Sequence, residues 1–351
     1  MLNATAIMNP PMVSVIMPVL NGELFISEAI KSALNQTFRD FEIIVVDGRS
    51  SDNTVSIVQT FILNDPRIRL TTQITSGLPA AKNLGIQTSK GKYIAFLESD
   101  DLWHPDKLLV QVTEMEKNPS IGLISCLSTA IDHRGKLLGW KLGVNENGNV
   151  YKAVLKRNPI SSCSVPLIRS ECLSEVGLFN NSCKFSDDWE MWIRFTKKFP
   201  IRTVPKVLLG YRRCYSNRSR NYKEMINDGE FILKEAFKND PELPKHFYNF
   251  CLARKASTIA GMCLIDGQYK DAKECLADSF RRSRFAFLLD FRMFGIAALV
   301  MLGSILPVFV FENCILKWLL PLAFKIRKGK KFADLYASVP HYTNIKLLLV
   351  L

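Results

Sequence analysis

Acidic residues directly follow two segments of the sequence that have the apolar pattern of buried strands. Asp47 comes after FEIIVV, and Glu98, Asp100 and Asp101 come after YIAFL. Three carboxylates so close together repel one another, so they either take raised pKa values or hold a cation. Carboxylate oxygens favour Mg²⁺ or Mn²⁺, which keep coordination positions for phosphate oxygens. The alternative is a solvated acidic loop that only caps the next helix.

A third acidic pair, Asp187 and Asp188, precedes an apolar helix face in the segment FSDDWEMWIRF. Acidic side chains at such a place often serve only as helix caps, because they accept hydrogen bonds from free backbone N–H groups. In a cleft opposite a metal site, one of them could instead accept the proton of an attacking hydroxyl.

The segments around the first acids alternate between strand and helix patterns. Strands are predicted at Val13–Pro18, Phe41–Val46, Ile68–Thr72 and Tyr93–Leu97, and helices at Glu23–Asn35, Thr54–Leu63 and Pro79–Thr88. This alternation predicts a parallel sheet with helices on both faces. Because ligands of such sheets bind beyond the carboxyl ends of the strands, the residues after Val46 and Leu97 are expected to form the site.

The pattern changes after Trp103. A helix is predicted at Lys107–Lys117 and an apolar segment at Ile121–Ser128, and the Gly- and Asn-rich stretch that follows favours excursions over the sheet. From residue 227 to residue 284 the sequence has a helical pattern, with a turn at Gly267 between two helices. No GxGxxG follows the first strand and no GxxxxGK[ST] occurs, which excludes a dinucleotide-binding fingerprint and a P-loop.

The net charge of +13 is concentrated near the C-terminus, because residues 251–351 carry 15 Lys and Arg against 7 Asp and Glu. There, Met293–Phe311 contains 19 residues without a charge, and cations stand before and after the apolar region 285–324. Three interpretations of this region stay open: attachment as a surface or re-entrant membrane segment, a spanning hairpin, and a soluble helical core. A basic nucleic-acid-binding protein is disfavoured, because the charge lies beside this apolar region. Nine dispersed cysteines favour a reduced, cytosolic compartment.

Three ordered segments together resemble the inverting family 2 glycosyltransferases, which have the fold known as GT-A. They are VSVIMPVLNGELFISEAIKSALNQTFRDFEIIVVDGRSSDNT, SGLPAAKNLGIQTSKGKYIAFLESDDLWHPDKL and SDDWEMWIRF. The resemblance implies an α/β GT-A fold, with a mostly parallel central sheet flanked by helices and an all-helical C-terminal appendage. It covers about residues 12–211, so we expect a catalytic domain at residues 1–225. Residues 226–351 are expected to form a helical region whose segment 285–324 associates with a membrane.

The resemblance also assigns roles to individual residues. It implies that Asp188 is the catalytic base and that Asp100 and Glu98 hold a divalent cation, Mg²⁺ or Mn²⁺. The implied contacts to the nucleotide and the donor sugar are Pro18, Val19, Asn21, Asp47, Lys82, Asn83, Gly85, Glu98, Ser99 and Asp101. Arg212, Arg213 and Arg218 are candidates to meet the diphosphate.

This chain departs from the usual family pattern at several positions. The stretch after the second strand is Asp47-Gly48-Arg49-Ser50, which has lost one acid and gained a cation that could reach a phosphate. Asp187 stands in place of the usual glutamate, and Cys214 stands where a histidine is common.

The implied activity is transfer of a sugar, with inversion, from a nucleotide-diphosphate sugar to a hydroxyl acceptor on a lipid-linked glycan or a polysaccharide. We expect it to occur in the cytoplasm at the inner face of the membrane, and expect no nucleic-acid partner. An inactive scaffold with the same fold stays the alternative, together with a basic protein that binds nucleic acid or membrane.

Overall fold

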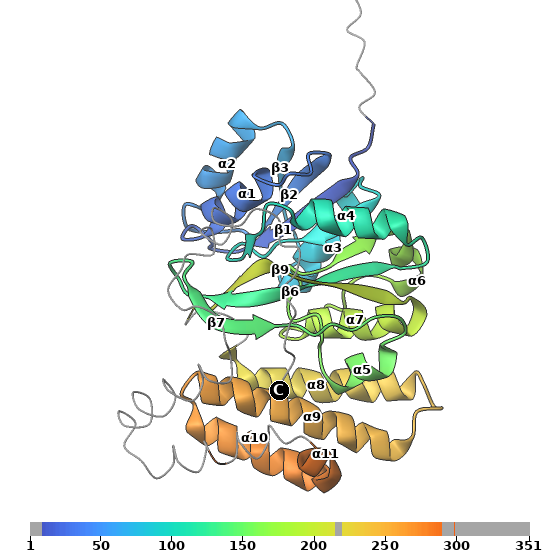
Figure 1. Cartoon of the computed structure of the whole chain (residues 1–351). Coiled ribbons are helices and arrows are strands. Elements are labelled where there is room, and N and C mark those ends of the chain that lie inside the picture. Colours follow the sequence, from blue (N-terminus) through green and yellow to red (C-terminus); the bar gives the residue numbers. More distant parts are fainter. Residues whose placement is uncertain (1–8, 215–219, 290–297, 299–351) are drawn as a thin grey trace, which may run out of the picture.

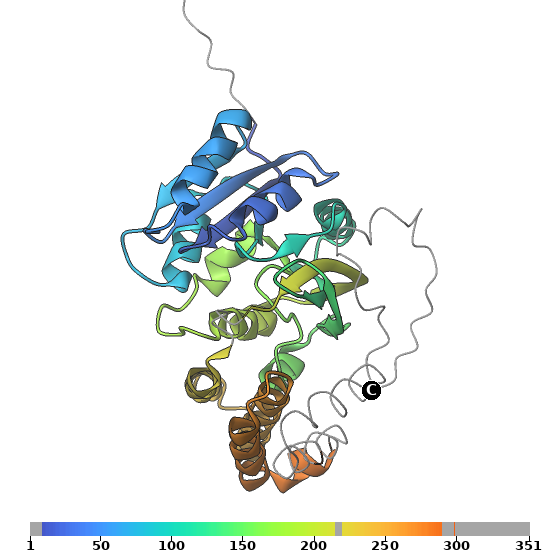
Figure 2. The same cartoon turned by 90° about the vertical axis from the view of Figure 1, so that its left-hand side faces the viewer.

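The structure is a computed structural model that describes residues 9–214, 220–289 and 298 (Figure 1). A central sheet with flanking helices forms the upper part of the molecule in this view, and a layer of helices lies beneath it. Figure 2 shows the same two parts from the side. Most of the predicted membrane-associating segment, from residue 290 on apart from residue 298, lies outside the described residues, as does Cys314.

The first half of the sheet is parallel. β1 (Val13–Val19) pairs with β2 (Phe41–Asp47) and β4 (Tyr93–Phe96), and β2 pairs with β3 (Ile68–Thr72). Every residue of β1 is buried, as its continuous apolar pattern requires when both faces of a sheet are covered. The strands are connected through α1 (Ile26–Leu34), α2 (Thr54–Asn64) and α3 (Leu78–Thr88). The predicted alternation is confirmed, with element ends shifted by a few residues.

The second half of the sheet is mixed, so the prediction of a mostly parallel sheet holds only for the first four strands. The strands of this half are β5 (Leu102–Trp103), β6 (Leu123–Ile131), β7 (Leu137–Leu142), β8 (Leu167–Arg169) and β9 (Ile201–Arg212). β8 pairs antiparallel with β4 and with β6, and β6 pairs parallel with β9. β5 pairs antiparallel with β9, and β7 pairs antiparallel with β6. A short turn at Gly135 connects β6 and β7, and a turn this short requires antiparallel neighbours.

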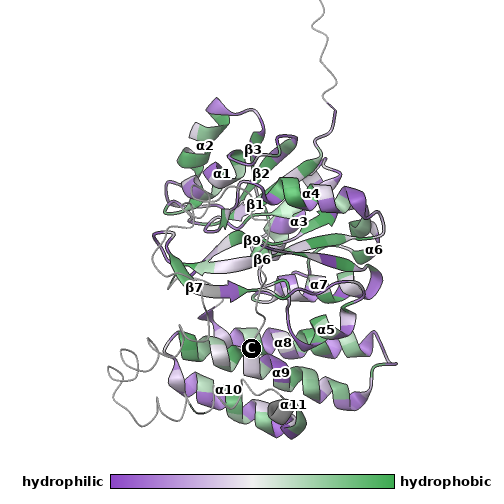
Figure 3. Ribbon diagram, in the orientation of Figure 1, coloured by the Kyte–Doolittle hydropathy of each residue, from purple (hydrophilic) through white to green (hydrophobic). Residues whose placement is uncertain are grey.

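Further helices lie between and after the strands of this mixed half. They are α4 (Lys107–Lys117), α5 (Tyr151–Lys156), the 3₁₀ helix η1 (Ser170–Cys172), α6 (Leu173–Val176) and α7 (Asp187–Lys198). α7 buries Trp189, Trp192 and Phe195 on one face, as the predicted apolar helix face requires. The colours of Figure 3 show the contrast between the largely apolar strands and the mixed surface of the helices.

The helical region consists of α8 (Tyr222–Lys238), α9 (Lys245–Ile265), α10 (Tyr269–Arg282) and α11 (Arg284–Leu289). Gly267 has a φ of 73° in the turn between α9 and α10, so the predicted helix pair is confirmed. The expected domain boundary after residue 225 falls inside α8.

A single apolar core joins the sheet to the helical region. It extends from Val13 in β1 through Trp192 in α7 to Leu233 in α8 and Cys251 in α9. A second, smaller cluster lies among α8, α9 and α10. Burial of apolar side chains is the main source of folding free energy, so the sheet and the first part of the helical region stabilise one another.

The buried cysteines that the structure describes are free thiols, and Cys214 is half-buried. Buried thiols of this kind pack as small apolar side chains. Among the described helices, none combines the length and hydropathy needed to cross a bilayer.

Candidate active site

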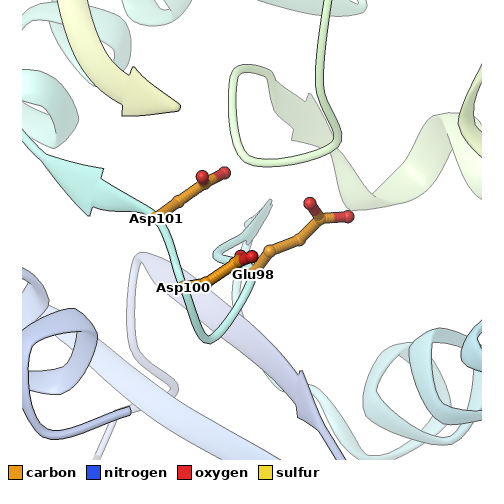
Figure 4. A group of neighbouring side chains, drawn as sticks. All are labelled: Glu98, Asp100 and Asp101. Carbon is orange, nitrogen blue, oxygen red and sulfur yellow. The ribbon is translucent and has the colours of Figure 1, made fainter. Parts of the chain in front are cut away.

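The acidic loop after β4 brings its three carboxylates together. Ligand oxygens of Glu98, Asp100 and Asp101 all lie within 4.8 Å of one another. Figure 4 shows the three side chains leaving one short loop toward a shared space. The loop begins where β4 ends, beside the carboxyl end of β1, which is where the sequence predicts the site.

Two of these acids are held by neighbouring elements. The backbone N–H of Glu98 donates to Ser164 Oγ at 3.0 Å. Asp101 Oδ1 accepts the backbone N–H of Arg212 at 3.0 Å, and its Oδ2 lies 3.4 Å from Ser162 Oγ. Because both oxygens of Asp101 already have protein partners, this buried residue fixes the loop to β9. Glu98 and Asp100 are the better candidates to meet a cation.

Arg212 fixes the same loop from the end of β9. Its side chain is fully buried, its Nε donates to the carbonyl oxygen of Asp100 at 2.7 Å, and its Nη2 pairs with Glu28 at 2.7 Å. This arrangement differs from the sequence-based suggestion that Arg212 meets a diphosphate, because its donors are used within the protein. Arg213 pairs with Asp266 of the helical region, and Arg218 lies outside the described residues.

Burial and mutual repulsion shift the titration of the loop. Burial raises the pKa of Glu98 to about 7, with the charge of Asp100 adding to the effect and Lys82 opposing it. Burial also raises the pKa of Asp100. Burial and then the charges of Asp100 and Glu98 raise the pKa of Asp101 well above its usual value. A divalent cation would offset this repulsion, and the carboxylate set therefore fits Mg²⁺ or Mn²⁺.

Lys82 of α3 connects the acidic loop to the start of α7. Its Nζ lies 2.7 Å from Asp187 Oδ2 and 3.9 Å from Glu98 Oε1, and its side chain is 1% exposed. These neighbours, chiefly Asp187, raise the pKa of Lys82 although burial opposes them. Acids about 90 positions apart in the sequence thus converge on one buried ammonium group, in a single site.

Asp188 is the second residue of α7. Asn158 donates to its Oδ2 at 3.1 Å, and the backbone N–H of Trp189 to its Oδ1 at 2.7 Å. Burial and then the charge of Asp187 raise the pKa of Asp188, while Lys82 and Lys255 oppose the shift. A carboxylate with a raised pKa is a better proton acceptor than an ordinary aspartate.

The ends of β1 and β2 form the other side of the site. Val19 is in register with Asp47, and Pro18 precedes it in β1. The carboxylate of Asp47 accepts the backbone N–H groups of Arg49 at 3.0 Å and Ser50 at 3.2 Å, which closes the turn after β2. Arg49, the cation in this departure from the family pattern, has a φ of 68° and an Nη2 that donates to the carbonyl oxygen of Ile74.

Asn21 ties the loop after β1 to the turn after β2. Its backbone N–H donates to Ser50 Oγ at 2.9 Å, and its side-chain oxygen accepts the N–H of Ser51 at 2.8 Å. Asn21 has a φ of 52°, a conformation that asparagine tolerates better than most residues. Ser99 lies next to this loop, since a Cβ on Gly22 would be 3.3 Å from its Oγ.

Two further predicted residues have structural contacts. Asn83 exchanges hydrogen bonds of 2.9 Å and 2.8 Å with the backbone of Phe179, so its amide fixes the segment before α7. A Cβ on Gly85 would lie 2.3 Å from a methyl group of Ile16, so glycine lets α3 pack closely on β1. Both residues therefore shape the site through packing.

Gln73 is a residue of the site that the sequence did not indicate. It follows β3, and its backbone N–H donates to the carbonyl oxygen of Asp47 at 3.0 Å. The residue is 7% exposed, and its Oε1 has no hydrogen-bond partner among the described residues. A buried acceptor without a partner is costly, so a bound group that donates a hydrogen bond to it would stabilise the protein. Its position after the third predicted strand was the only available signal.

Residues 14–157 match the family described as Glycosyl transferase family 2. These residues form a domain of this family. The family 2 match covers the parallel half of the sheet, the acidic loop and Lys82, whereas Asp188 and the helical region lie beyond it.

Curated proteins of similar sequence include other glycosyltransferases. An uncharacterized glycosyltransferase from Rickettsia conorii is 29% identical over 285 residues, which cover 80% of this chain and 46% of that protein. A chondroitin synthase from Escherichia coli is 26% identical over 219 residues, covering 61% of this chain and 30% of the synthase. The chain thus spans less than half the length of these two relatives.

Two solved structures have a similar fold. Residues 1–349 of S. aureus TarS in complex with UDP-GlcNAc give a TM-score of 0.58 at 17% identity, covering 84% of this chain and 87% of that one. The mannosyltransferase PcManGT from Pyrobaculum calidifontis, in complex with GDP-Man and Mn²⁺, gives 0.53 at 19%, covering 90% and 85%. These likenesses confirm the predicted GT-A fold class with its helical C-terminal region.

Proposed function

We propose that this protein transfers a sugar, with inversion, from a nucleotide-diphosphate sugar to an acceptor hydroxyl. The observation that carries the proposal is the convergence of Glu98 and Asp187 on Lys82, with Asp188 next to Asp187. This arrangement sets a candidate base beside a candidate cation site at the carboxyl ends of parallel strands, where α/β sheets bind ligands.

The donor nucleotide is proposed to lie over the ends of β1, β2 and β3. Pro18, Val19 and Asn21 would border it, and Asp47 and Gln73 would face its base. The unpartnered Gln73 Oε1 supports this placement, because a base N–H would supply its missing donor. The two similar structures contain UDP-GlcNAc and GDP-Man, which supports a nucleotide sugar as the donor class.

Asp100 and Glu98 are proposed to hold Mg²⁺ or Mn²⁺ beside the donor diphosphate. A divalent cation there would neutralise the charge that grows on the departing nucleoside diphosphate. The support is the set of closely spaced carboxylates and the Mn²⁺ named with PcManGT. Ser99 lies within the same loop and Asp101 anchors it.

Asp188 is proposed to take the proton of the acceptor hydroxyl. The acceptor oxygen then forms a bond to the anomeric carbon while the bond from that carbon to the diphosphate oxygen breaks. Because attack and departure occur on opposite faces in one displacement, the anomeric configuration inverts. Asn158 holds one oxygen of Asp188, which orients the carboxylate for this proton transfer.

The acceptor is proposed to be a lipid-linked glycan or a polysaccharide at the cytosolic face of a membrane. The support is the net charge of +8 over residues 251–351, where 15 basic residues face 7 acidic ones, together with the 19-residue uncharged segment Met293–Phe311. Binding of the full chain to anionic vesicles, measured by sedimentation, tests this part. Equal binding to neutral and anionic vesicles would contradict the electrostatic argument.

Hydrolysis of a panel of UDP- and GDP-sugars tests the donor and the metal together. We expect the full chain to hydrolyse one of them slowly with Mn²⁺ or Mg²⁺ and not with chelator, since water can replace the acceptor. Mn²⁺ alone should also raise the melting temperature, because a ligand of the native state stabilises it. Hydrolysis that is equally fast in chelator would remove the cation from the proposal.

Calorimetry with two aspartate variants locates the cation. Asp100→Ala should abolish the Mn²⁺-dependent binding of the hydrolysed nucleotide sugar. Asp40→Ala is the matched control, because Asp40 is an exposed aspartate outside the acidic loop. Unchanged metal-dependent affinity in Asp100→Ala would show that the cation, if bound, is held elsewhere.

A further inference from the structure

The segment that carries Asp188 is held from outside the catalytic sheet. Asp228 of α8 accepts the backbone N–H groups of Phe185 at 2.7 Å and Ser186 at 2.9 Å through one carboxylate oxygen. Ser186 is the residue just before α7, so α8 fixes the point where the helix begins. The start of the helix that carries the candidate base therefore depends on the helical region.

Lys255 of α9 reaches the same segment from a second helix. Its Nζ lies 3.4 Å from Ser186 Oγ and 4.5 Å from the ring centroid of Trp189. These two contacts lie on either side of Asp187 and Asp188 along the chain. A Cβ on Gly229 would lie only 3.0 Å from Lys255 Cε, so a glycine in α8 leaves room for the lysine side chain. The helical region is thus shaped to deliver this ammonium group to the start of α7.

The charges around Asp188 give Lys255 a particular role. Asp187 of α7 disfavours ionised Asp188, whereas Lys82 of α3 and Lys255 of α9 favour it. Lys82 is already engaged by Asp187 and Glu98. Lys255 has no carboxylate oxygen within 4.0 Å among the described residues. Burial lowers the pKa of Lys255 to about 8, and the charge of Asp188 is the largest factor that opposes this shift.

We propose that Lys255 is a positioning residue, whose ammonium group orients the start of α7 and keeps the Asp188 carboxylate ionised for proton transfer. This inference rests on the proposed function, since it takes Asp188 as the base. It gives the helical region a part in catalysis besides any contact with a membrane. Without this charge, the half-buried carboxylate would stay protonated at higher pH and could not accept a proton.

The test is the pH profile of nucleotide-sugar hydrolysis by the full chain, using the sugar identified in the panel. Lys255→Met keeps the apolar stem and removes the charge. We expect the acidic limb of the kcat profile to shift to higher pH by about one unit in this variant. At a given pH on that limb, kcat should therefore fall by about tenfold. The two profiles should converge above pH 8, where Lys255 loses its proton in the wild type.

Three further variants separate this role from a structural one. Lys255→Arg keeps the charge and should restore the limb, and Lys255→Gln should behave as Lys255→Met does. Lys245→Met is the matched control, because Lys245 is an exposed lysine of the same helix. Donor KM and the donor affinity from calorimetry should stay within about twofold of wild type in all of them, because the donor lies on the other side of the site.

The results that overturn the inference differ from those that overturn the proposed base. An acidic limb at the wild-type pH in both Lys255→Met and Lys255→Gln would refute the role of Lys255, whether or not kcat falls uniformly. A wild-type rate in Asp188→Asn would instead refute the base itself. Thermal unfolding of each variant shows that the compared proteins are folded, and the glutamine variant serves if the methionine variant is not.

Discussion

The site has two sides: the proposed nucleotide side, at the ends of β1, β2 and β3, and the base side, around the proposed catalytic base Asp188. These two sides are built in different ways. On the nucleotide side, loops after successive parallel strands hold one another through short-range geometry, as Asn21 and Asp47 do. On the base side, Asp188 lies in the first turn of a helix whose start contacts Lys82 of α3, Asp228 of α8 and Lys255 of α9. The nucleotide side is part of the sheet architecture, whereas the base side is assembled from distant elements.

This difference predicts how each side of the site responds to substitutions in the residues around it. The parallel strands of β1 and β2 are buried within one cooperative sheet, so their loop ends are fixed by the fold. The start of α7 has several separate supports, each of which can be removed by one substitution. Variants at these supports should therefore affect turnover more than donor binding.

The largest expected effect is that of Asp188→Asn. The amide cannot take a proton, so kcat should fall by about 10²–10⁴-fold, which is the usual contribution of a positioned base. Donor affinity, measured by calorimetry, should not change, because Asp188 lies on the other side of the site from the nucleotide. A loss of donor affinity as large as the loss of rate would contradict the prediction that Asp188 acts in proton transfer and not in donor binding.

Lys82→Met should be the most destabilising change at the junction of the two sides. It leaves Asp187, whose side chain is 6% exposed, as a buried carboxylate without its partner. We expect a loss of about 3–5 kcal/mol in the free energy of unfolding, measured by denaturant titration. Lys92→Met is the control, because the pair of Lys92 with Glu116 is exposed and should contribute less than about 1 kcal/mol. Equal losses of unfolding free energy in the two variants would show that burial does not increase the contribution of the Lys82–Asp187 pair.

Asp228→Ala removes the acceptor for two backbone N–H groups before α7. The free energy of unfolding should fall by about 1–2 kcal/mol, as for other lost helix caps. The rate should fall by about tenfold at unchanged donor KM, because the base is less well placed. Asn221→Ala removes the side-chain cap of α8, and should cost stability without this loss of rate. A similar kcat for the two variants would argue against a dependence of Asp188 on α8.

The smallest expected effect is that of Gln73→Met on the nucleotide side. Donor affinity should fall by about 0.5–1.5 kcal/mol, the net contribution of one hydrogen bond, with kcat unchanged. The donor-free protein should gain stability, because a buried acceptor without a partner is removed. Calorimetry and thermal unfolding measure the two quantities. A stability loss would indicate that Gln73 has a structural role in the donor-free protein.

The parallel strands and the acidic loop could be predicted because their signals are local. Continuous apolar runs such as Phe41–Val46 are typical of strands that are buried on both faces. Glu98 and Asp100 come directly after another such run, Tyr93–Leu97. The mixed half of the sheet was not predicted, because β8 is three residues long and its pairing with β4 depends on contacts far apart in sequence. The roles given to Arg212 and Asn83 by resemblance did not anticipate that their side chains are occupied by the backbone of other loops.

The sequence alone determined the order of strands and helices in the parallel half of the sheet, the acids at the strand ends and the family to which they point, because these depend on residue type and on spacing over a few positions. Only the tertiary structure decided that Lys82 joins Glu98 to Asp187, and that Asp228 and Lys255 hold the start of α7. Except for the pair of Lys82 and Glu98, those contacts join residues more than 40 positions apart. Their formation depends on how the helical region packs on the sheet, and no local pattern encodes that packing.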